Sequence, residues 1–372
     1  MNRRAILGAI AAGAAASAPA AAGPALKGAG ARAGGAGSRN LITDVAGLKV
    51  GQAQDEAART GVTVILADEP ATAAVDVRGG GPGTRETDAL SAENLVHAVD
   101  AITLSGGSVY GLAAADGVVA WLGAQGRGFG MGPSTPGVPK SPIVPGAILF
   151  DLLNGGNKAW GMEPPYRALG IQAARTASDR FTLGTAGAGY GAGAGALKGG
   201  TGSASAVTAD GMTVGAIVAV NCFGSVIAPG GVHFWAAPFE IGDEFGGLGF
   251  SADGSGVEDW GMAKANPGAR QNTTIACVAT DVALTQPEVK RVAIMAQDGL
   301  ARAIRPVHAP FDGDVVFALS TGKIQPSEPP ELTVARIGAL AADVLARAIA
   351  RAVYEAAPWP GSPVRAWRQL PR

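Results

Sequence analysis

Residues 271–281 read QNTTIACVATD, and the interpretation of the whole chain depends on this stretch. From Thr274 to Thr280 the residues are apolar, small or β-branched and carry no charge, which is typical of a buried strand. The strand nevertheless begins with an amide and two adjacent hydroxyls, at Asn272, Thr273 and Thr274. From this motif alone, an ordinary structural strand is the favoured interpretation.

Thr273 could carry chemistry if the chain were cut in front of it. A threonine hydroxyl is a weak nucleophile, and the sequence holds no G-x-S-x-G motif that would indicate a Ser-His-Asp site. The α-amino group of an N-terminal residue has a pKa of about 8, so at neutral pH it can accept the proton of its own Oγ. Self-cleavage would create such a residue: Thr273 Oγ attacks the Asn272 carbonyl, the acyl group moves from nitrogen to oxygen, and water hydrolyses the ester.

The composition indicates a large folded core and excludes several classes of function. Of the 372 residues, 47% are hydrophobic and 16% are charged, with a net charge of -1. Lys and Arg are scattered, which leaves no basic surface for nucleic acid. Cys222 and Cys277 stand in apolar runs and predict buried thiols rather than a disulfide. His97, His233 and His308 lack zinc-ligand spacing, so no metal is expected.

The N-terminus predicts export. Arg3 and Arg4 precede an apolar run that is too short to span a bilayer, and 20–22 offers a small-residue cleavage site, so residues 1–22 resemble a twin-arginine signal. Residues 23–40 are interpreted as a Gly/Ala linker, and residues 41–372 as a single catalytic domain. The mature protein is then expected to be periplasmic or secreted. If the N-terminus is only an Ala-rich extension, a cytoplasmic location is expected instead.

Hydrophobic periodicity predicts a mixed α/β fold. Short apolar runs predict strands at 62–67, 72–77, 101–105, 212–220, 274–280 and 315–319. Apolar residues three or four apart predict helices at 91–102, 108–122, 285–303 and 331–354, the third with a capping box at its start. Because strands and helices do not alternate regularly, sheets sandwiched between helix layers fit better than a barrel or a doubly wound sheet.

Five polar residues in or beside these elements could serve a site. Asp312 and Asp314 stand two apart at the start of an expected strand, so both carboxylates could face one site, although the pair alone is more typical of a turn. Asn221 ends an expected strand and could donate an N–H to an oxyanion or cap the following turn. Tyr110, at a strand-to-helix junction, could line a pocket or simply pack, and Lys158 stands in a Gly/Asn loop, where most lysines are merely solvated.

A glycine-rich segment offers a motif that is easily over-interpreted. Residues 187–192 formally match the dinucleotide fingerprint G-x-G-x-x-G/A. In so Gly/Ala-rich a segment a chance match is expected, and neither a βαβ context nor a G-K-[ST] motif supports it. No cofactor is therefore expected. A plain surface loop and a site loop that presents Lys198 remain as interpretations.

Around Thr273 and the other candidate site residues, the sequence resembles a family of self-processing peptidases of the N-terminal nucleophile type. This family comprises L-aminopeptidase/D-esterases, β-peptidyl aminopeptidases and nylon-oligomer (6-aminohexanoate oligomer) hydrolases. The likeness covers most of residues 41–355 and rests on residues 271–281 together with the motifs ITDVAGLKVG, LSGGSVYGL, VPGAILFDL, LKGGTGSAS, DGLARAIRPVH and FDGDVVFALSTG. It implies a four-layer α/β/β/α sandwich and self-cleavage into an α chain, 41–272, and a β chain, 273–372. It also implies a homo-oligomer, by family analogy a tetramer.

The resemblance also implies roles for particular residues. Thr273 takes the position of the nucleophile, where the nylon-oligomer branch has threonine and the aminopeptidase branch typically has serine. Asn221 matches the asparagine of the oxyanion hole. Asp312 and Asp314 match paired polar residues that hold the nucleophile's amino group and orient its proton transfer.

Two further positions follow from the resemblance. Tyr110 matches a pocket tyrosine, and Lys158, with Lys198 as the alternative, matches a lysine implicated in the nylon-oligomer enzymes. A physical argument also favours a lysine here. Two carboxylates beside the Thr273 amine would raise its pKa unless a nearby cation offsets them.

The function expected from the sequence is a self-cleaving amide hydrolase acting on peptides or short oligoamides. Its only expected partners are these small substrates and further copies of the chain, without nucleic acid or membrane. The alternative is a non-enzymatic, uncleaved binding protein of the same fold, in which Thr273 is only a strand residue. A nucleotide-binding enzyme that uses the glycine-rich loop ranks third. The sequence leaves open the substrate and the choice between exo and endo cleavage.

Overall fold

The computed structural model describes residues 34–130, 137–252, 256–265, 272–362 and 364–371. The predicted signal, the linker up to residue 33 and Gln271 lie outside this part. Its strands are β1 (Leu48–Asp55), β2 (Thr60–Val77), β3 (Thr84–Arg85), β4 (Ala98–Ser105), β5 (Gly146–Ile148), β6 (Gly193–Ala194), β7 (Leu197–Lys198), β8 (Gly200–Val207), β9 (Thr213–Asn221), β10 (Thr273–Val282) and β11 (Val315–Ile324). Its α-helices are α1 (Ala113–Ala124), α2 (Tyr166–Arg175), α3 (Gln286–Ala303) and α4 (Pro330–Tyr354).

The long strand β2 joins two groups of strands. Hydrogen bonding runs in the order β3-β5-β4-β2-β11-β10-β9-β8, with β1 paired to β2 and β6 paired only to β7. The first half of β2 pairs with β1 and β4, and its second half pairs with β11. The register against β4 shifts between Leu66 and Ala71, where the two halves meet. One group, β1, the first half of β2 and β4, is thereby continuous in hydrogen bonding with the other, β8 to β11.

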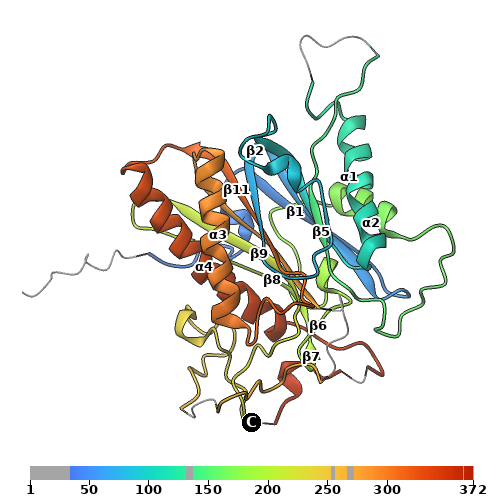
Figure 1. The fold of residues 1–372 in the computed structure, drawn as a ribbon, viewed down its shortest axis with the longest axis vertical. Helices are drawn as coiled ribbons and strands as arrows, with labels where there is room; N and C mark the ends of the chain where they lie inside the picture. The colour runs from blue at the N-terminus through green and yellow to red at the C-terminus, as the bar shows by residue number, and fades with distance from the viewer. Residues whose placement is uncertain (1–33, 131–136, 253–255, 266–271, 363, 372) are drawn as a thin grey trace, which may run out of the picture. The chain divides into compact units, whose positions relative to one another are not determined.

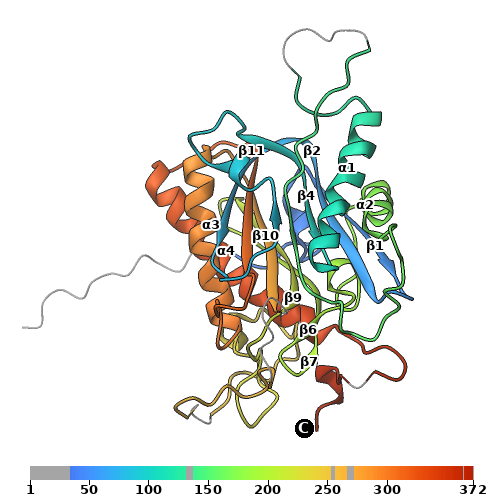
Figure 2. The ribbon, with the colours of Figure 1, turned by 45° about the vertical axis from the view of Figure 1, so that its right-hand side comes forward.

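Three apolar clusters separate four layers. Alternate residues of β10 enter different clusters: Ile275 and Cys277 lie between the two groups of strands, whereas Ala276 and Val278 pack towards α3 and α4. The third cluster joins β1, β2 and β4 to α1 and α2. Figures 1 and 2 show the two helix pairs on opposite sides of the strands. The order helices, sheet, sheet, helices confirms the predicted α/β/β/α sandwich.

Most of the predicted elements are present, and one helix prediction is wrong. The six predicted strand runs all lie in strands, but the runs 62–67 and 72–77 form one continuous strand, β2. Helices α1, α3 and α4 match the predicted helices, and in α3 the capping box forms, with Thr285 N donating to Glu288 Oε2 at 2.7 Å. Residues 91–97, by contrast, are turns and loop, and β4 begins at Ala98. Val99, Ile102 and Leu104 are buried between the sheets, so tertiary packing overrides the helical periodicity there.

The folded part begins before residue 41. Gly35 exchanges two backbone hydrogen bonds with Val207, and the Asn40 side chain accepts a hydrogen bond from Ser205 N at 3.0 Å and donates one to Glu244 at 2.6 Å. Residues 35–40, which composition suggests are linker, are therefore attached to β8. Both cysteines are buried free thiols, as predicted. Among the described residues there is no helix of the length and hydropathy that a membrane span requires.

Candidate active site

Strand pairing brings Thr273 and Asn221 together. Thr273 opens β10 directly opposite Asn221, the last residue of the antiparallel neighbour β9. Side chains alternate along a strand, so Thr273 points to the same side as Ile275, and Asn221 to the same side as Ala219. Both of these apolar residues lie between the two sheets. Thr273 and Asn221 are thus buried side by side where the inter-sheet core ends.

The peptide bond before Thr273 is held from two directions. The Asn272 carbonyl accepts a hydrogen bond from Gly313 N at 2.9 Å and another from the Thr273 hydroxyl. A Cβ at Gly313 would stand 2.8 Å from Thr273 Oγ1, so glycine is the residue that fits this approach. A hydroxyl beside the preceding carbonyl, with an N–H polarising that carbonyl, is the arrangement that an acyl shift from nitrogen to oxygen requires.

The side chain of Asn221 is oriented at both ends. Its Oδ1 accepts a hydrogen bond from Gly193 N at 2.9 Å, and its Nδ2 donates to the Phe150 carbonyl at 3.0 Å. The backbone donor at Gly193 fixes which end of the amide is the oxygen. An amide held in this way can present its N–H₂ group to an anionic oxygen without reorganising, as an oxyanion hole does.

Asp312 and Asp314 lie close to Thr273, and their carboxylates accept hydrogen bonds from the segments around the strand ends. Asp314 accepts hydrogen bonds from Thr274 N at 2.8 Å and from His308 Nδ1 at 2.9 Å. Asp312 accepts from the N–H groups of Phe223 and Ala309, at 3.3 and 3.2 Å. These contacts hold the loops around the strand ends and the backbone of Thr274, and the expectation that both carboxylates face one site stays a prediction. Burial, with the neighbouring charge of Asp314, raises the pKa of Asp312 to about 6.

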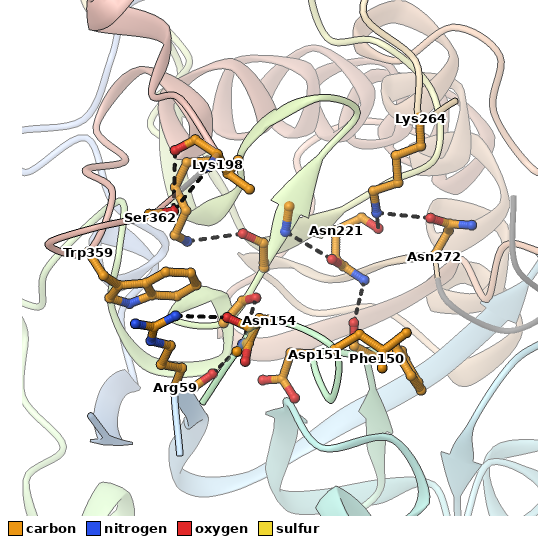
Figure 3. Close-up of a pocket in the computed structure, with 16 residues that line it drawn as sticks. Arg59, Phe150, Asp151, Asn154, Lys198, Asn221, Lys264, Asn272, Trp359 and Ser362 are labelled. Atoms are coloured by element: carbon orange, nitrogen blue, oxygen red, sulfur yellow. Dashed lines mark hydrogen bonds between the residues drawn. The ribbon is translucent and has the colours of Figure 1, made fainter. Parts of the chain in front are cut away.

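A cavity of about 390 Å³ opens next to these strand ends (Figure 3). A volume of this order suits a small ligand. Its charged lining residues are Arg59, Lys198, Lys264 and Asp151. The remaining lining residues are Phe150, Leu153, Asn154, Gly155, Gly191, Ala192, Gly193, Asn221, Asn272, Trp359, Ser362 and Val364.

Of the two candidate lysines, the structure places Lys198 at the cavity. Lys198 is fully buried, and its Nζ donates to the carbonyls of Ala192 and Gly199 at 3.0 and 2.7 Å. Burial lowers the pKa of Lys198 to about 7. Lys158 instead donates to the Ala58 carbonyl and is not among the cavity-lining residues.

Tyr110 is not brought to the cavity either. Its ring is about half exposed and packs edge-on against Trp160, with 5.7 Å between the ring centroids. The cavity wall near Asn221 carries Phe150 instead. The prediction of Tyr110 as a pocket residue is therefore corrected. A strand-to-helix junction does not determine which way its side chains point.

The sequence reasoning missed several lining residues. Asp151 accepts hydrogen bonds from Thr60 Oγ1 at 2.6 Å and Gly107 N at 2.8 Å, and burial raises its pKa. Its place after the apolar run AILF could have suggested a carboxylate at a strand end. Lys264 and Trp359 stand in irregular segments that carry no periodic signal.

The glycine-rich segment does not form a phosphate cradle. Ala188 N already donates to Thr63 Oγ1 at 2.9 Å, and Gly189 N to Thr201 Oγ1 at 3.0 Å. Both residues are buried against β2 and β8, so these N–H groups are not directed at a ligand. Within the described residues, no group of three or more His, Cys, Asp or Glu side chains is placed to hold a metal ion.

Comparison with known proteins assigns this arrangement to a family. The model of Peptidase family S58 matches residues 40–365. The chain belongs to Peptidase family S58. This S58 peptidase is 44% identical over 346 residues to an uncharacterized aminopeptidase of Mycobacterium tuberculosis, covering 87% of this chain and 96% of the relative. It is 29% identical over 336 residues to a 6-aminohexanoate-oligomer endohydrolase of a Kocuria species, covering 85% and 86%.

Solved structures agree on the fold of the S58 peptidase. A β-aminopeptidase from a Burkholderia species superimposes with a TM-score of 0.65 at 23% identity, covering 90% of this chain and 92% of that one. An L-aminopeptidase D-Ala-esterase/amidase from Ochrobactrum anthropi, described as a variant of the Ntn hydrolase fold, gives a TM-score of 0.61 at 21% identity, covering 89% and 90%. The S58 peptidase is accordingly an amide-bond hydrolase, and a non-enzymatic binding protein is disfavoured.

Proposed function

We propose that this S58 peptidase cuts itself between Asn272 and Thr273 and then uses the N-terminal Thr273 to hydrolyse amide bonds in short peptides or oligoamides. The observation that carries the proposal is the Thr273 hydroxyl beside the Asn272 carbonyl, which Gly313 N–H polarises at 2.9 Å. The names of the relatives, aminopeptidase and 6-aminohexanoate-oligomer endohydrolase, support the substrate class. The test is a denaturing gel of the purified protein, on which a fragment spanning residues 273–372 is expected.

The contacts of the uncut bond support the following steps of the proposed self-cleavage. Thr273 Oγ attacks the Asn272 carbonyl carbon, and Gly313 N–H stabilises the oxygen as it gains negative charge. The C–N bond breaks, and the hydroxyl proton passes to the leaving nitrogen, which becomes the Thr273 amine. Water then hydrolyses the ester, which leaves a carboxylate on Asn272 and restores the Thr273 hydroxyl.

Turnover reuses the same hydroxyl with a new base. The Thr273 amine accepts the Oγ proton while Oγ attacks the substrate carbonyl, and Asn221 donates to the developing oxyanion. The leaving amine takes the proton, and water hydrolyses the acyl-threonine ester. Asp312 and Asp314 act by fixing the loops at the strand ends, because their hydrogen bonds run to backbone N–H groups of these loops and of Thr274.

Lys198 is proposed to act through Asn221. Its ammonium holds the Ala192 carbonyl, one residue before the Gly193 N–H that orients Asn221. Lys198→Met should lower kcat about 10- to 100-fold with little change in KM, because hydrogen bonds to a charged group contribute about 1.5–3 kcal/mol. Lys158→Met is the matched control, since this lysine also donates to a backbone carbonyl but lies outside the cavity lining; its kcat should stay within about threefold. A larger loss at Lys158 would contradict this assignment.

The raised pKa of Asp312 predicts a pH-dependent difference in stability. A carboxyl group whose pKa is higher in the folded chain adds stability below its unfolded pKa of about 3.9, and this stability is lost as the pH rises through about 6. In a Thr273→Ala background, which keeps the chain in one piece, Asp312→Asn removes this dependence. The free energy of unfolding of Asp312→Asn minus that of its parent should fall by about 1–3 kcal/mol from about pH 7 to pH 4. Urea unfolding at several pH values checks this, and a constant difference would refute it.

Export and assembly stay predictions. We propose that residues 1–22 direct the folded precursor out of the cytoplasm and that the mature chains form a homo-oligomer. Twin-arginine export suits a self-cleaving protein because it carries folded chains, and self-cleavage needs a folded site.

A further inference from the structure

Lys264 links the two strand ends of the candidate site. It is half-buried in the loop between β9 and β10, and its backbone N–H donates to the Phe223 carbonyl at 3.0 Å. Its Nζ donates to Asn272 Oδ1 at 2.9 Å and to the Asn221 carbonyl at 3.3 Å (Figure 3). One ammonium group therefore contacts the residue on the acyl side of the proposed scissile bond and the backbone of the proposed oxyanion residue.

Within the part of the chain that the structure describes, the Lys264 ammonium is bound by hydrogen bonds and not by an ion pair. Its two hydrogen-bond acceptors are neutral oxygens, and the groups that favour its charge are the Cys222 thiol and the Asp312 carboxyl. Burial outweighs these and lowers the pKa of Lys264 to about 8. A cation kept in such a place at an active site indicates a role beyond solubility.

Asn272 depends on Lys264 for the placement of its side chain. Asn272 is fully buried, and its Nδ2 has no hydrogen-bond partner among the described residues. Its Oδ1 is held by Lys264, while its backbone carbonyl is held by Gly313 N–H. Without Lys264 the Asn272 side chain would lose the contact that fixes its rotation, and only the hydrogen bonds at its backbone carbonyl, from Gly313 N–H and the Thr273 hydroxyl, would still position the residue.

We propose that Lys264 is a positioning residue for self-cleavage, which clamps Asn272 so that its carbonyl stays against the Thr273 hydroxyl and Gly313 N–H. The proposal rests on the proposed self-cleavage. The clamp acts on the uncut bond, so the Asn272 side chain should matter for processing.

A double-mutant cycle tests the clamp. The wild type, Lys264→Met, Asn272→Leu and the double variant are made by cell-free translation with a labelled pulse, and the uncut fraction is followed over time on denaturing gels. Each single variant should slow self-cleavage about 10- to 100-fold, as expected for losing a hydrogen bond to a charged group. Both substitutions remove the same contact, the hydrogen bond from Lys264 to Asn272. The double variant should therefore be cut no more than about threefold more slowly than the slower single variant.

Two further variants separate positioning from general damage. Asn272→Asp keeps an acceptor for Lys264 and should be processed within about threefold of the wild-type rate. Lys290→Met is the control, because Lys290 Nζ, like that of Lys264, donates to a backbone carbonyl, here that of Val75. Lys290 also contacts Asp76, and it lies on α3 outside the cavity lining. The rate of self-cleavage of Lys290→Met should therefore equal that of the wild type.

The outcomes discriminate between this proposal and the proposed function. If the wild type is cut but either Lys264→Met or Asn272→Leu is cut at the wild-type rate, the clamp is refuted and self-cleavage stands. The clamp would also be refuted if the double variant slowed self-cleavage by the product of the two single factors. It would be refuted as well if Asn272→Asp were cut as slowly as Asn272→Leu. A wild type that stays uncut would refute the proposed function itself. If Lys264→Met is insoluble, Asn272→Leu against Asn272→Asp still decides the question.

Discussion

Thr273→Ala should give a single uncut chain with no measurable amidase activity. Both proposed reactions use the same oxygen atom: Thr273 Oγ attacks the Asn272 carbonyl during processing and the substrate carbonyl during turnover. Alanine removes that oxygen and one methyl group and keeps the backbone of β10, which is what pairs with Asn221. Losing a covalent nucleophile lowers kcat by roughly 10⁴-fold or more. Denaturing gels and hydrolysis of amino-acid amides measure the two losses on the same preparation.

Thr273→Ser is the control for Thr273→Ala. Serine keeps the hydroxyl and loses only a methyl group, so this variant should still be cut before residue 273 and should retain turnover. Mass spectrometry of the small fragment should place its first residue at 273. An alanine variant that is still cut at this bond, or that keeps wild-type activity without being cut, would exclude Thr273 as the nucleophile.

Thr273 and Asn221 could be found from the sequence because each stands at one end of a short, uninterrupted apolar run, Thr273 before its run and Asn221 after its own. Such runs predict strands, and strand ends collect polar groups at one edge of a sheet. The pairing of β9 with β10, which places these two residues opposite each other, is a long-range contact and follows only from the fold. The local pattern therefore supplies the candidates, and the register brings them into one site.

The lysines of the site could not be found in the same way. Lys198 lies in a two-residue strand and Lys264 in an irregular segment, so periodicity does not show which way either side chain points. Their places depend on contacts between distant segments, such as Ala196 N to the Met262 carbonyl at 2.7 Å. The family resemblance favoured Lys158, but the ammonium of this residue donates to the Ala58 carbonyl.

Asn221→Ala should lower kcat about 100- to 1000-fold while the protein stays folded. Removing one oxyanion donor costs roughly 3–4 kcal/mol of transition-state stabilisation, which gives this factor. The effect should fall on kcat rather than KM, because the oxyanion exists only in the transition state and the intermediate. Steady-state kinetics on an amino-acid anilide, with rates divided by the concentration of cut enzyme, separates kcat from KM.

The fold of the variant needs its own control, because Asn221 also makes structural hydrogen bonds. Asn221 accepts from Gly193 N and donates to the Phe150 carbonyl. Asn40 has the same pattern at a distance from the cavity: its amide accepts from Ser205 N and donates to Glu244. Asn40→Ala should lower Tm at least as much as Asn221→Ala, because Asn40 also accepts a hydrogen bond from Arg347 Nη2 at 2.9 Å and has a φ of 51°, which alanine disfavours. If Asn40→Ala keeps wild-type kcat while Asn221→Ala loses two to three orders of magnitude, the loss belongs to the oxyanion. Equal losses of kcat in both variants would instead assign the effect of Asn221 to stability.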